Sequence, residues 1–306
     1  HDMNVEYRYY APNQGLEEQQ AKIFNKAAKP PAQATGKAIQ ERYEQENVDP
    51  KTIRYAMTAN GTMLAYCQAR DYPALGETHI GYPWALPKCP PEVQEKLFDD
   101  LLAYLKEREE TLTIRTSAAL DWETQIAFFK KRGLVEIEHG FQYLVDLDVT
   151  EASQLEKDTV DNSFTSYIAT DADLDVLLEI INADPVAKSI FPDDETWIRY
   201  FRERVLPDGH AVILFHEDQI VAASAPLRVP PGKEEHIIFR FQATRPGYAS
   251  AWKALLIEIA KECLAAGWTD LPLRVNFGFF SNSPLAQLLA RLQPDLEVSS
   301  IRFGLE

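Results

Sequence analysis

The sequence has few cysteines, few basic residues relative to its acidic ones, and no long apolar run. The three cysteines, Cys67, Cys89 and Cys263, are odd in number and widely spaced, which is typical of neither a disulfide framework nor a zinc site. We therefore expect reduced thiols, a cytoplasmic protein and no bound metal. No apolar run approaches the about 20 residues of a membrane span and no signal peptide is recognisable, so we expect no membrane partner.

Acidic residues outnumber basic ones by 47 to 31, which gives a net charge of −16. Nucleic acids and anionic membranes both require a basic surface, so this charge argues against either as a partner. An amine substrate is compatible with it, although many soluble proteins are equally acidic. With 306 residues, 45% of them hydrophobic, the chain is long enough for two domains.

Residues 236–267 predict a strand, a tight loop and a helix. Residues 236–241 are β-branched and aromatic, and Pro246 and Gly247 then interrupt the run. The apolar positions that follow recur with helical spacing at Trp252, Leu255, Leu256, Ile259, Ala260, Cys263 and Leu264. A glycine-marked loop before a helix presents N–H groups and the positive end of the helix dipole, which suits a phosphate. An ordinary strand-to-helix connection is the alternative.

The two halves of the chain repeat one order of elements: strand, two helices, three meander strands, helix, strand, helix, strand. The predicted hairpin turns at Asn60 and Glu217 are 157 residues apart, and so are the long helices at Phe98 and Leu255. A period near half the chain length indicates a duplication. The fold class is therefore α/β (α+β), with two tandem units.

A polar segment without apolar periodicity, residues 150–162, is the predicted linker. It separates an N-terminal domain at 3–149 from a C-terminal domain at 163–306. His1 and Asp2, ahead of Met3, are interpreted as a cloning remnant and lie outside these ranges.

This order, with a loop feeding the long helix after the fourth strand, resembles the GNAT N-acetyltransferase fold, present twice as in mycothiol synthase-like tandem proteins. The resemblance implies mixed, mostly antiparallel sheets flanked by helices. It also implies that the fourth and fifth strands part and that coenzyme A lies between them. Its pantetheine arm then follows the fourth strand, and its pyrophosphate lies on the N-terminus of the next helix.

The family's loop pattern is Arg/Gln-x-x-Gly-x-Gly/Ala, often with an Arg-Gly pair. Gly247 matches the Gly of that pair, Ala249 replaces the first motif Gly, and Ala251 is an allowed form of the second. Small residues let N–H groups approach a pyrophosphate, and Arg245 adds positive charge. The resemblance thus implies an acetyl-CoA site formed by Phe241, Ala243, Arg245, Gly247, Tyr248, Ala249, Ser250, Ala251 and Asn282.

Asn282 enters this set because it begins an Asn-x-x-x-Ala sequence, as in the family, with a plain helix N-cap as the alternative. The first half differs at the corresponding loop, residues 89–94. That loop has no Gly, its two prolines remove N–H donors, and Glu92 places a negative charge where a pyrophosphate would lie. We therefore interpret the N-terminal domain as a degenerate copy and the C-terminal domain as the one that binds the cofactor.

The family's acid is commonly a Tyr on the helix after the fifth strand, but the matching positions here are Phe129 and Leu289. Some members place a base at the start of the fourth strand, where Glu235 and His236 lie. We predict these two residues as catalytic, with exposed hairpin residues as the alternative.

The resemblance implies an acetyl-CoA-dependent N-acetyltransferase that acts on a small amine through the C-terminal domain. The absent Tyr and the altered loops leave a second hypothesis, a catalytically inactive tandem protein that binds a ligand or a partner. Transfer of a different acyl group is a third hypothesis.

Overall fold

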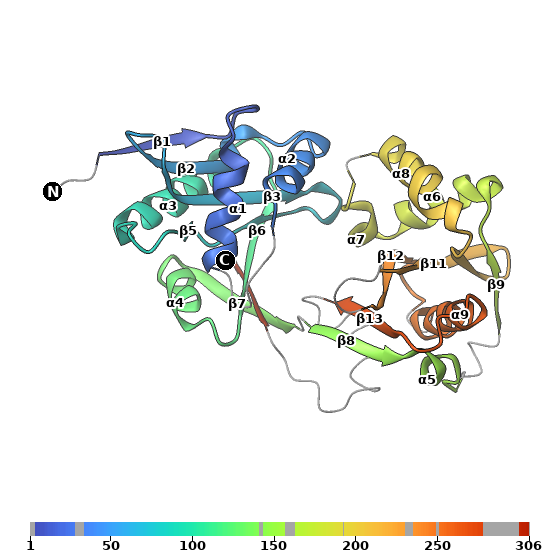
Figure 1. Cartoon of the computed structure of the whole chain (residues 1–306). Helices are drawn as coiled ribbons and strands as arrows, with labels where there is room; N and C mark the ends of the chain where they lie inside the picture. The colour runs from blue at the N-terminus through green and yellow to red at the C-terminus, as the bar shows by residue number, and fades with distance from the viewer. Residues whose placement is uncertain are drawn as a thin grey trace. The chain divides into compact units, whose positions relative to one another are not determined.

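The computed structural model describes residues 4–27, 34–140, 143–156, 163–191, 193–229, 235–248, 251–277 and 300–305 (Figure 1). Contacts divide the chain into two compact units. The first comprises residues 1–117, 123–135 and 303–306, and the second comprises residues 118–122 and 136–302.

The first unit is built around one sheet with helices on its faces. Its elements are β1 (Val5–Tyr9), α1 (Leu16–Ala27), α2 (Gly36–Gln45), β2 (Ile53–Thr58), β3 (Met63–Tyr72), β4 (Glu77–Ile80), β5 (Trp84–Ala85), α3 (Pro91–Glu107), β6 (Thr113–Ala119), α4 (Glu123–Lys131) and β7 (Leu134–Gly140). The last residues of β6 and residues 136–140 of β7 fall in the range of the second unit. The strand order is β1-β2-β3-β4-β6-β14-β7, in which β14 is the C-terminal strand Ser300–Leu305 and β5 pairs with β3. The expected hairpin turns at Gly61, where φ is +84°.

The second unit repeats this plan. Its elements are β8 (Tyr143–Asp148), α5 (Val149–Ser153), β9 (Phe164–Ile168), α6 (Leu174–Ala183), α7 (Pro185–Lys188), α8 (Asp194–Tyr200), β10 (Val212–His216), β11 (Gln219–Arg228), β12 (Ile237–Thr244), α9 (Ala251–Ala265) and β13 (Pro272–Phe277). The strand order is β8-β13-β12-β11-β10-β9, and only the β12–β13 pair is parallel in this described sheet. The predicted fold class, two mixed and mostly antiparallel sheets flanked by helices, is confirmed.

Two parts of the fold are irregular. Strands β4 and β5 are separate because Gly81 and Pro83 interrupt the run, and they pair with different stretches of β3, residues 69–72 and 65–66. Helix α8 is followed by a wider helical turn at Phe201–Val205.

Each sheet includes a strand from the other half of the sequence. Strand β8 precedes the predicted linker, yet it pairs with β13, with Asp148 opposite Pro272 and Tyr143 opposite Phe277. Strand β14, at the C-terminus, lies between β6 and β7. This exchange is the reason that the compact units do not coincide with residues 3–149 and 163–306.

The segment expected as a linker, 150–162, begins inside helix α5. Asp148 caps this helix by accepting a hydrogen bond from the Glu151 N–H at 2.9 Å. Val149 and Ala152 are buried in the hydrophobic core beneath α9. Burial against α9 therefore stabilises residues 149–153 as a helix.

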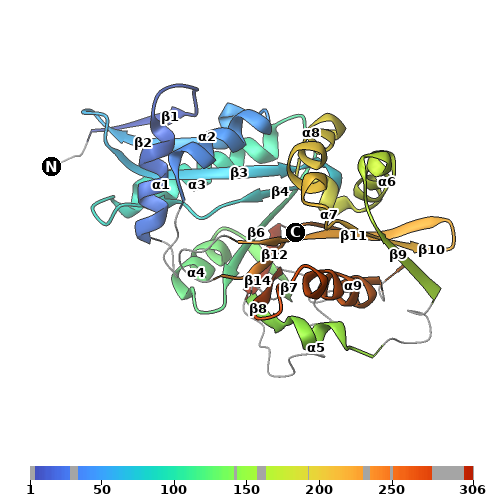
Figure 2. The same cartoon turned by 45° about the vertical axis from the view of Figure 1, so that its right-hand side comes forward.

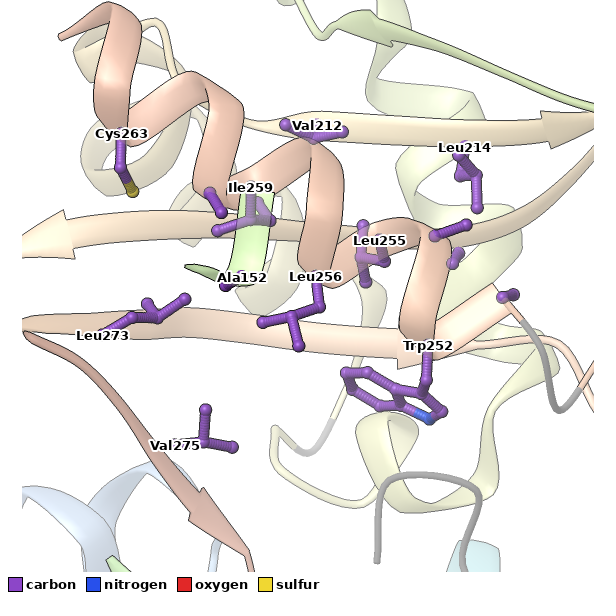
Figure 3. Packing of buried hydrophobic residues seen from close by; sticks show 14 of the residues in the cluster. Ala152, Val212, Leu214, Trp252, Leu255, Leu256, Ile259, Cys263, Leu273 and Val275 are labelled. Carbon is purple, nitrogen blue, oxygen red and sulfur yellow. The ribbon is translucent and has the colours of Figure 1, made fainter. Parts of the chain in front are cut away.

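The sheet of the second unit has a hydrophobic core on each face, and Figure 2 shows α9 and α5 on one face and α6, α7 and α8 on the other. The α9 core joins that helix to β10–β13 through residues such as Leu255, Val212 and Leu273 (Figure 3). The opposite core contains Trp197, Phe201 and Phe241. These two cores hold β12 from both sides.

We expect Phe303→Ala to destabilise the first unit strongly although it changes a residue near the C-terminus. Phe303 is fully buried and its ring lies 5.9 Å from that of Phe129. Removing a buried Phe side chain costs about 3–5 kcal/mol. Urea unfolding should show this loss, and amide exchange should accelerate in β6 and β7.

Tyr9→Ala is the control, because Tyr9 lies on the exposed edge strand of the same sheet. Its cost should stay below about 1 kcal/mol. An equal, small effect of both changes would contradict the placement of β14 inside the first sheet.

Candidate functional site

Strands β12 and β13 form a fork. They are parallel and paired at one position, Ile237 opposite Leu273, near the start of each strand. Figure 3 shows Leu273 beneath α9 and Val275 farther out, where β13 bends away. Beyond Ile237, the edge of β12 that faces away from β11 has no ladder pairing with β13 among the described residues. We call this edge the open edge.

A β-bulge lies in the middle of β12. Ser224 pairs with Gln242 and Pro226 pairs with Phe239, so two steps along β11 match three along β12. Pro226 has no N–H to give to the ladder, which explains why the irregularity falls here.

The bulge reverses the faces of β12. Phe239, before the bulge, packs against the α9 core, whereas Phe241, after it, is buried in the core under α6 and α8. The carbonyls at the bulge are satisfied by side chains: Tyr200 donates to the Arg240 carbonyl at 2.8 Å, and Ser224 donates to the Phe241 carbonyl at 2.6 Å. The bulge is thus held by hydrogen bonds from two different elements.

The loop after β12 turns at Gly247, where φ is +90°. Apart from Gly247 and its two chain neighbours, no heavy atom of the described chain lies within 4 Å of the place that a Cβ would take at Gly247. The main chain there is therefore open to an approaching group, and the positive φ favours Gly. Helix α9 starts at Ala251, whose N–H donates to the Tyr248 carbonyl at 3.0 Å.

Arg245, predicted to add charge for a phosphate, is engaged within the protein. Its Nε donates to the Ile220 carbonyl at 2.8 Å, and its guanidinium forms an ion pair with Glu179 at 2.9 Å. Its main-chain N–H donates to the Val221 carbonyl at 2.8 Å. In this arrangement Arg245 ties the loop to β11 and to helix α6.

Asp184, between α6 and α7, secures the other side of the loop. One carboxylate oxygen accepts the Thr244 N–H at 2.9 Å, and the other accepts the N–H groups of Val186 and Ala187 at 3.0 and 3.2 Å. Because the Arg245 N–H points to β11, the preceding Thr244 N–H points to the open edge. Desolvation raises the pKa of the Asp184 carboxyl, while the three N–H groups act in the opposite direction.

The predicted catalytic pair lies at the start of β12. The Glu235 carboxylate pairs with Arg228 at 2.9 Å, and the His236 carbonyl accepts the Val229 N–H at 2.9 Å. His236 is five residues before Phe241, or about 16 Å along an extended strand at about 3.3 Å per residue.

Beside His236 lies a bidentate ion pair between β8 and β13. Arg274 donates from Nε and Nη2 to the two oxygens of Asp146, at 2.7 and 3.0 Å. These hydrogen bonds lower the pKa of Asp146 against the effect of desolvation, and the charges of Arg274 and His236 lower it further. His236 therefore lies in an environment with charges of both signs.

The structure thus brings Phe241, Ala243, Arg245, Gly247, Tyr248 and Ala251 together at the end of β12 and the start of α9. It places Glu235 and His236 at the other end of the strand. Ala249, Ser250, Asn282 and Leu289 lie outside the described residues. Sequence reasoning missed Asp184, Glu179 and Tyr200, although Pro226 within an apolar strand was a signal for the bulge.

In the first unit the corresponding two strands, β4 and β6, are paired, and aromatic side chains pack beyond β4. Strands β4 and β6 pair along three successive positions, and Thr116 donates to the Ile80 carbonyl at 2.6 Å. Tyr82, just after β4, packs its ring against Phe128 and Phe129 at 5.3 and 6.2 Å. Phe129 is fully buried and is therefore a core residue.

Helix α3 in the first unit has no side-chain cap and begins with Pro90 and Pro91. Within its first turns, Gln94 donates to the Pro83 carbonyl at 2.7 Å. Protein groups therefore occupy the space ahead of this helix, where the second unit has the open loop at Gly247.

The three cysteines carry free, buried thiols. Burial raises the pKa of Cys89 to about 11 and that of Cys263 to about 12, which keeps both thiols protonated at neutral pH. Among the described residues, no group of His, Cys, Asp and Glu side chains is arranged to hold a metal ion. In the same part of the chain, no helix is long and apolar enough to cross a membrane.

Neither a protein-family model nor a curated protein sequence matches this chain. Solved structures do match it. A tandem GNAT protein from the clavulanic acid biosynthesis pathway is similar with a TM-score of 0.62 and 11% identity, over 98% of each chain.

A GCN5-related N-acetyltransferase from Sphaerobacter thermophilus has a TM-score of 0.55 and 13% identity, over 98% of this chain and 94% of that one. A GNAT-family acetyltransferase from Colwellia psychrerythraea has a TM-score of 0.53 and 13% identity, over 98% and 100%. The chain therefore has the GNAT fold. It carries this fold twice, in the tandem arrangement of the first of these proteins.

We expect Asp146→Asn to reduce stability at neutral pH by about 0.5–1 kcal/mol, since the Asp146 side chain is 44% exposed and solvent screens the pair. Folding lowers the pKa of Asp146 below its ordinary value of 3.8. The stability from this pair is therefore present above pH 4 and is lost as the pH falls through the lower, folded pKa.

Urea unfolding of both proteins between pH 7 and pH 2.5 measures this difference, which should shrink below about pH 4. Asp270→Asn, at an exposed position just before β13, is the control and should change little at any pH. A difference that grows in acid would contradict the assignment.

Proposed function

We propose that the second unit binds acetyl-CoA at the fork and transfers the acetyl group to a small amine. The observation that carries this proposal is the asymmetry between the units. The ladder between β12 and β13 ends at Ile237, and β12 leads to an open loop at Gly247, whereas β4 and β6 pair at three positions and Tyr82 packs against an aromatic cluster beyond β4.

The residues at the fork suit such a cofactor. The main chain at Gly247 is accessible, so its N–H can approach a diphosphate near the positive end of α9. Phe241 and Ala243 have side chains buried in the core, which holds the strand that would carry the pantetheine arm. The Asp184 carboxylate accepts hydrogen bonds from three N–H groups, so its negative charge offsets little of the positive potential at the proposed diphosphate site.

When bound, acetyl-CoA supplies an acetyl thioester that a neutral amine nitrogen can attack. The new bond joins nitrogen to the acetyl carbon, the carbon–sulfur bond breaks, one proton leaves the amine and the sulfur ends as a thiol. His236 and Glu235 are the proposed proton acceptors, acting through water because they lie toward the start of β12. Their position beside Asp146 and Arg274 keeps polar groups near that water.

We further propose that the N-terminal domain is a degenerate copy without a cofactor, and that Ala249, Ser250 and Asn282 complete the site in the C-terminal domain. A catalytically inactive binding protein is the second candidate. It is favoured by Phe129 in the position of the family's acid and by the engagement of Arg245 with Glu179. The two candidates share cofactor binding at the fork and differ in whether acetyl transfer follows.

Calorimetric titration with acetyl-CoA tests the binding step. We expect micromolar affinity for the unaltered chain and no detectable binding by Gly247→Glu, because the new side chain places a negative charge at the proposed diphosphate-binding site. Gly267→Glu is the matched control: Gly267 has a φ of +80° at the other end of α9, so it carries a similar backbone strain. Absence of binding by the unaltered chain would refute the proposal.

Acetyl transfer to a panel of small amines tests the chemistry. Removal of a general base costs about 10²–10⁴-fold in rate, so His236→Asn or Glu235→Gln should lower kcat with little change in acetyl-CoA affinity. A chain that binds acetyl-CoA but acetylates no amine would support the inactive binding protein instead. Rates unchanged in both variants would remove these residues from the mechanism.

A further inference from the structure

Gln242 carries an unsatisfied acceptor at the fork. Its side-chain Oε1 is shielded from solvent and has no hydrogen-bond partner in the part of the chain that the structure describes. A buried acceptor without a partner has lost its hydrogen bonds to water and forms no bond within the protein, so it destabilises the folded state. Such an atom needs an explanation, and one explanation is a donor that arrives with a ligand.

The place of Gln242 in the strand is defined by its neighbours. It lies just after the bulge, opposite Ser224 on β11 and two residues before Thr244. Ala222 belongs to the α9 core and Ala223 to the core on the other face, so Ser224 and Gln242 lie on the α9 face by alternation. Gln242 is therefore on the strand that borders the fork, on the side where α9 begins.

The main chain of Gln242 shares the direction of Thr244. Because residues two apart in a strand point the same way, its N–H and carbonyl face the open edge, as the Thr244 N–H does. Asp184 satisfies Thr244, but it has already used both oxygens on three N–H groups. The Asp184 carboxylate is therefore not available to Gln242.

Trp197 also has a polar atom without a partner in the described part of the chain, but this residue lies in a hydrophobic core away from the fork. The Nε1 of Trp197 also has no partner in the described residues. Its ring is enclosed by Phe191, Tyr200 and Phe201, in the core under α6 and α8, on the opposite face of the sheet from Gln242. Trp197 is held by its aromatic contacts, whereas Gln242 borders the fork.

We propose that Gln242 is a ligand-binding side chain of the fork, whose Oε1 accepts an amide N–H from the pantetheine arm of coenzyme A. This inference rests on the proposed function and adds a side-chain contact to it. The contact favours an arm that carries an amide donor, because an arm without one leaves the buried oxygen unpaired. Gln242 then helps to select the cofactor rather than to hold the fold.

Gln242→Met tests the proposal, because Met has a similar length and shape but no acceptor amide. The affinity for coenzyme A should fall about tenfold, as expected for one lost hydrogen bond to a buried group. The affinity for adenosine 3′,5′-bisphosphate, which has no pantetheine arm, should not change. The melting temperature without ligand should stay the same or rise, because an unpaired buried acceptor has been removed.

Trp197→Phe is the control, and it should leave the affinities for both probes unchanged. Equal affinity of coenzyme A for Gln242→Met and the unaltered chain would overturn the proposal, and so would a lower melting temperature with both probes weakened. If the unaltered chain binds coenzyme A and only the variant result fails, the proposed function stands. If the unaltered chain binds neither probe, the proposed function fails and the role of Gln242 fails with it.

Discussion

The missing N–H of Pro226 is the constraint on which the second unit depends. A strand that cannot donate at one position cannot keep a regular ladder with β12, and β12 takes an extra residue there. The bulge turns Phe241 into the core under α6 and α8, while Phe239 stays with the α9 core. Beyond the bulge, β12 is held by side chains from α8, β11 and Asp184 rather than by β13.

The comparison of the two units shows how the same element order supports different sites. In the first unit the parallel strands remain paired, and an aromatic cluster around Tyr82 occupies the space after the fourth strand. In the second unit the parallel strands part, and Gly247 leaves the main chain accessible before α9. The difference arises from a few side chains at the ends of the strands, since the topology is shared.

The exchanged strands give the first half a structural role. Strand β8 forms the outer neighbour of β13, and the Asp146–Arg274 ion pair joins the two strands beside His236. Helix α5, which follows β8, contributes Val149 and Ala152 to the core beneath α9. The second unit therefore contains residues encoded before the predicted linker.

Several features of the fold could be predicted because they depend on residues that are close together in the sequence. The turn at Asn60 and Gly61, the apolar face of α9 and the break at Gly247 each depend on residues close in sequence, and each appears where it was expected. The repeat indicated the fold because it compares patterns within the chain. The prediction of a linker over residues 150–162 missed helix α5 at the start of that segment, because this helix is stabilised by burial against α9, which its own sequence does not reveal.

The sequence by itself determined the element order, the duplicated α/β fold and the position of the glycine loop, because these follow from hydrophobic periodicity and turn chemistry. Only the tertiary structure decided which strands are exchanged, that Arg245 pairs with Glu179, that Asp184 accepts the Thr244 N–H, and that Gln242 is left unpaired. The physical reason is that interacting residues such as these are far apart in the sequence, by about 60 to more than 120 residues, so only folding brings them within hydrogen-bond distance.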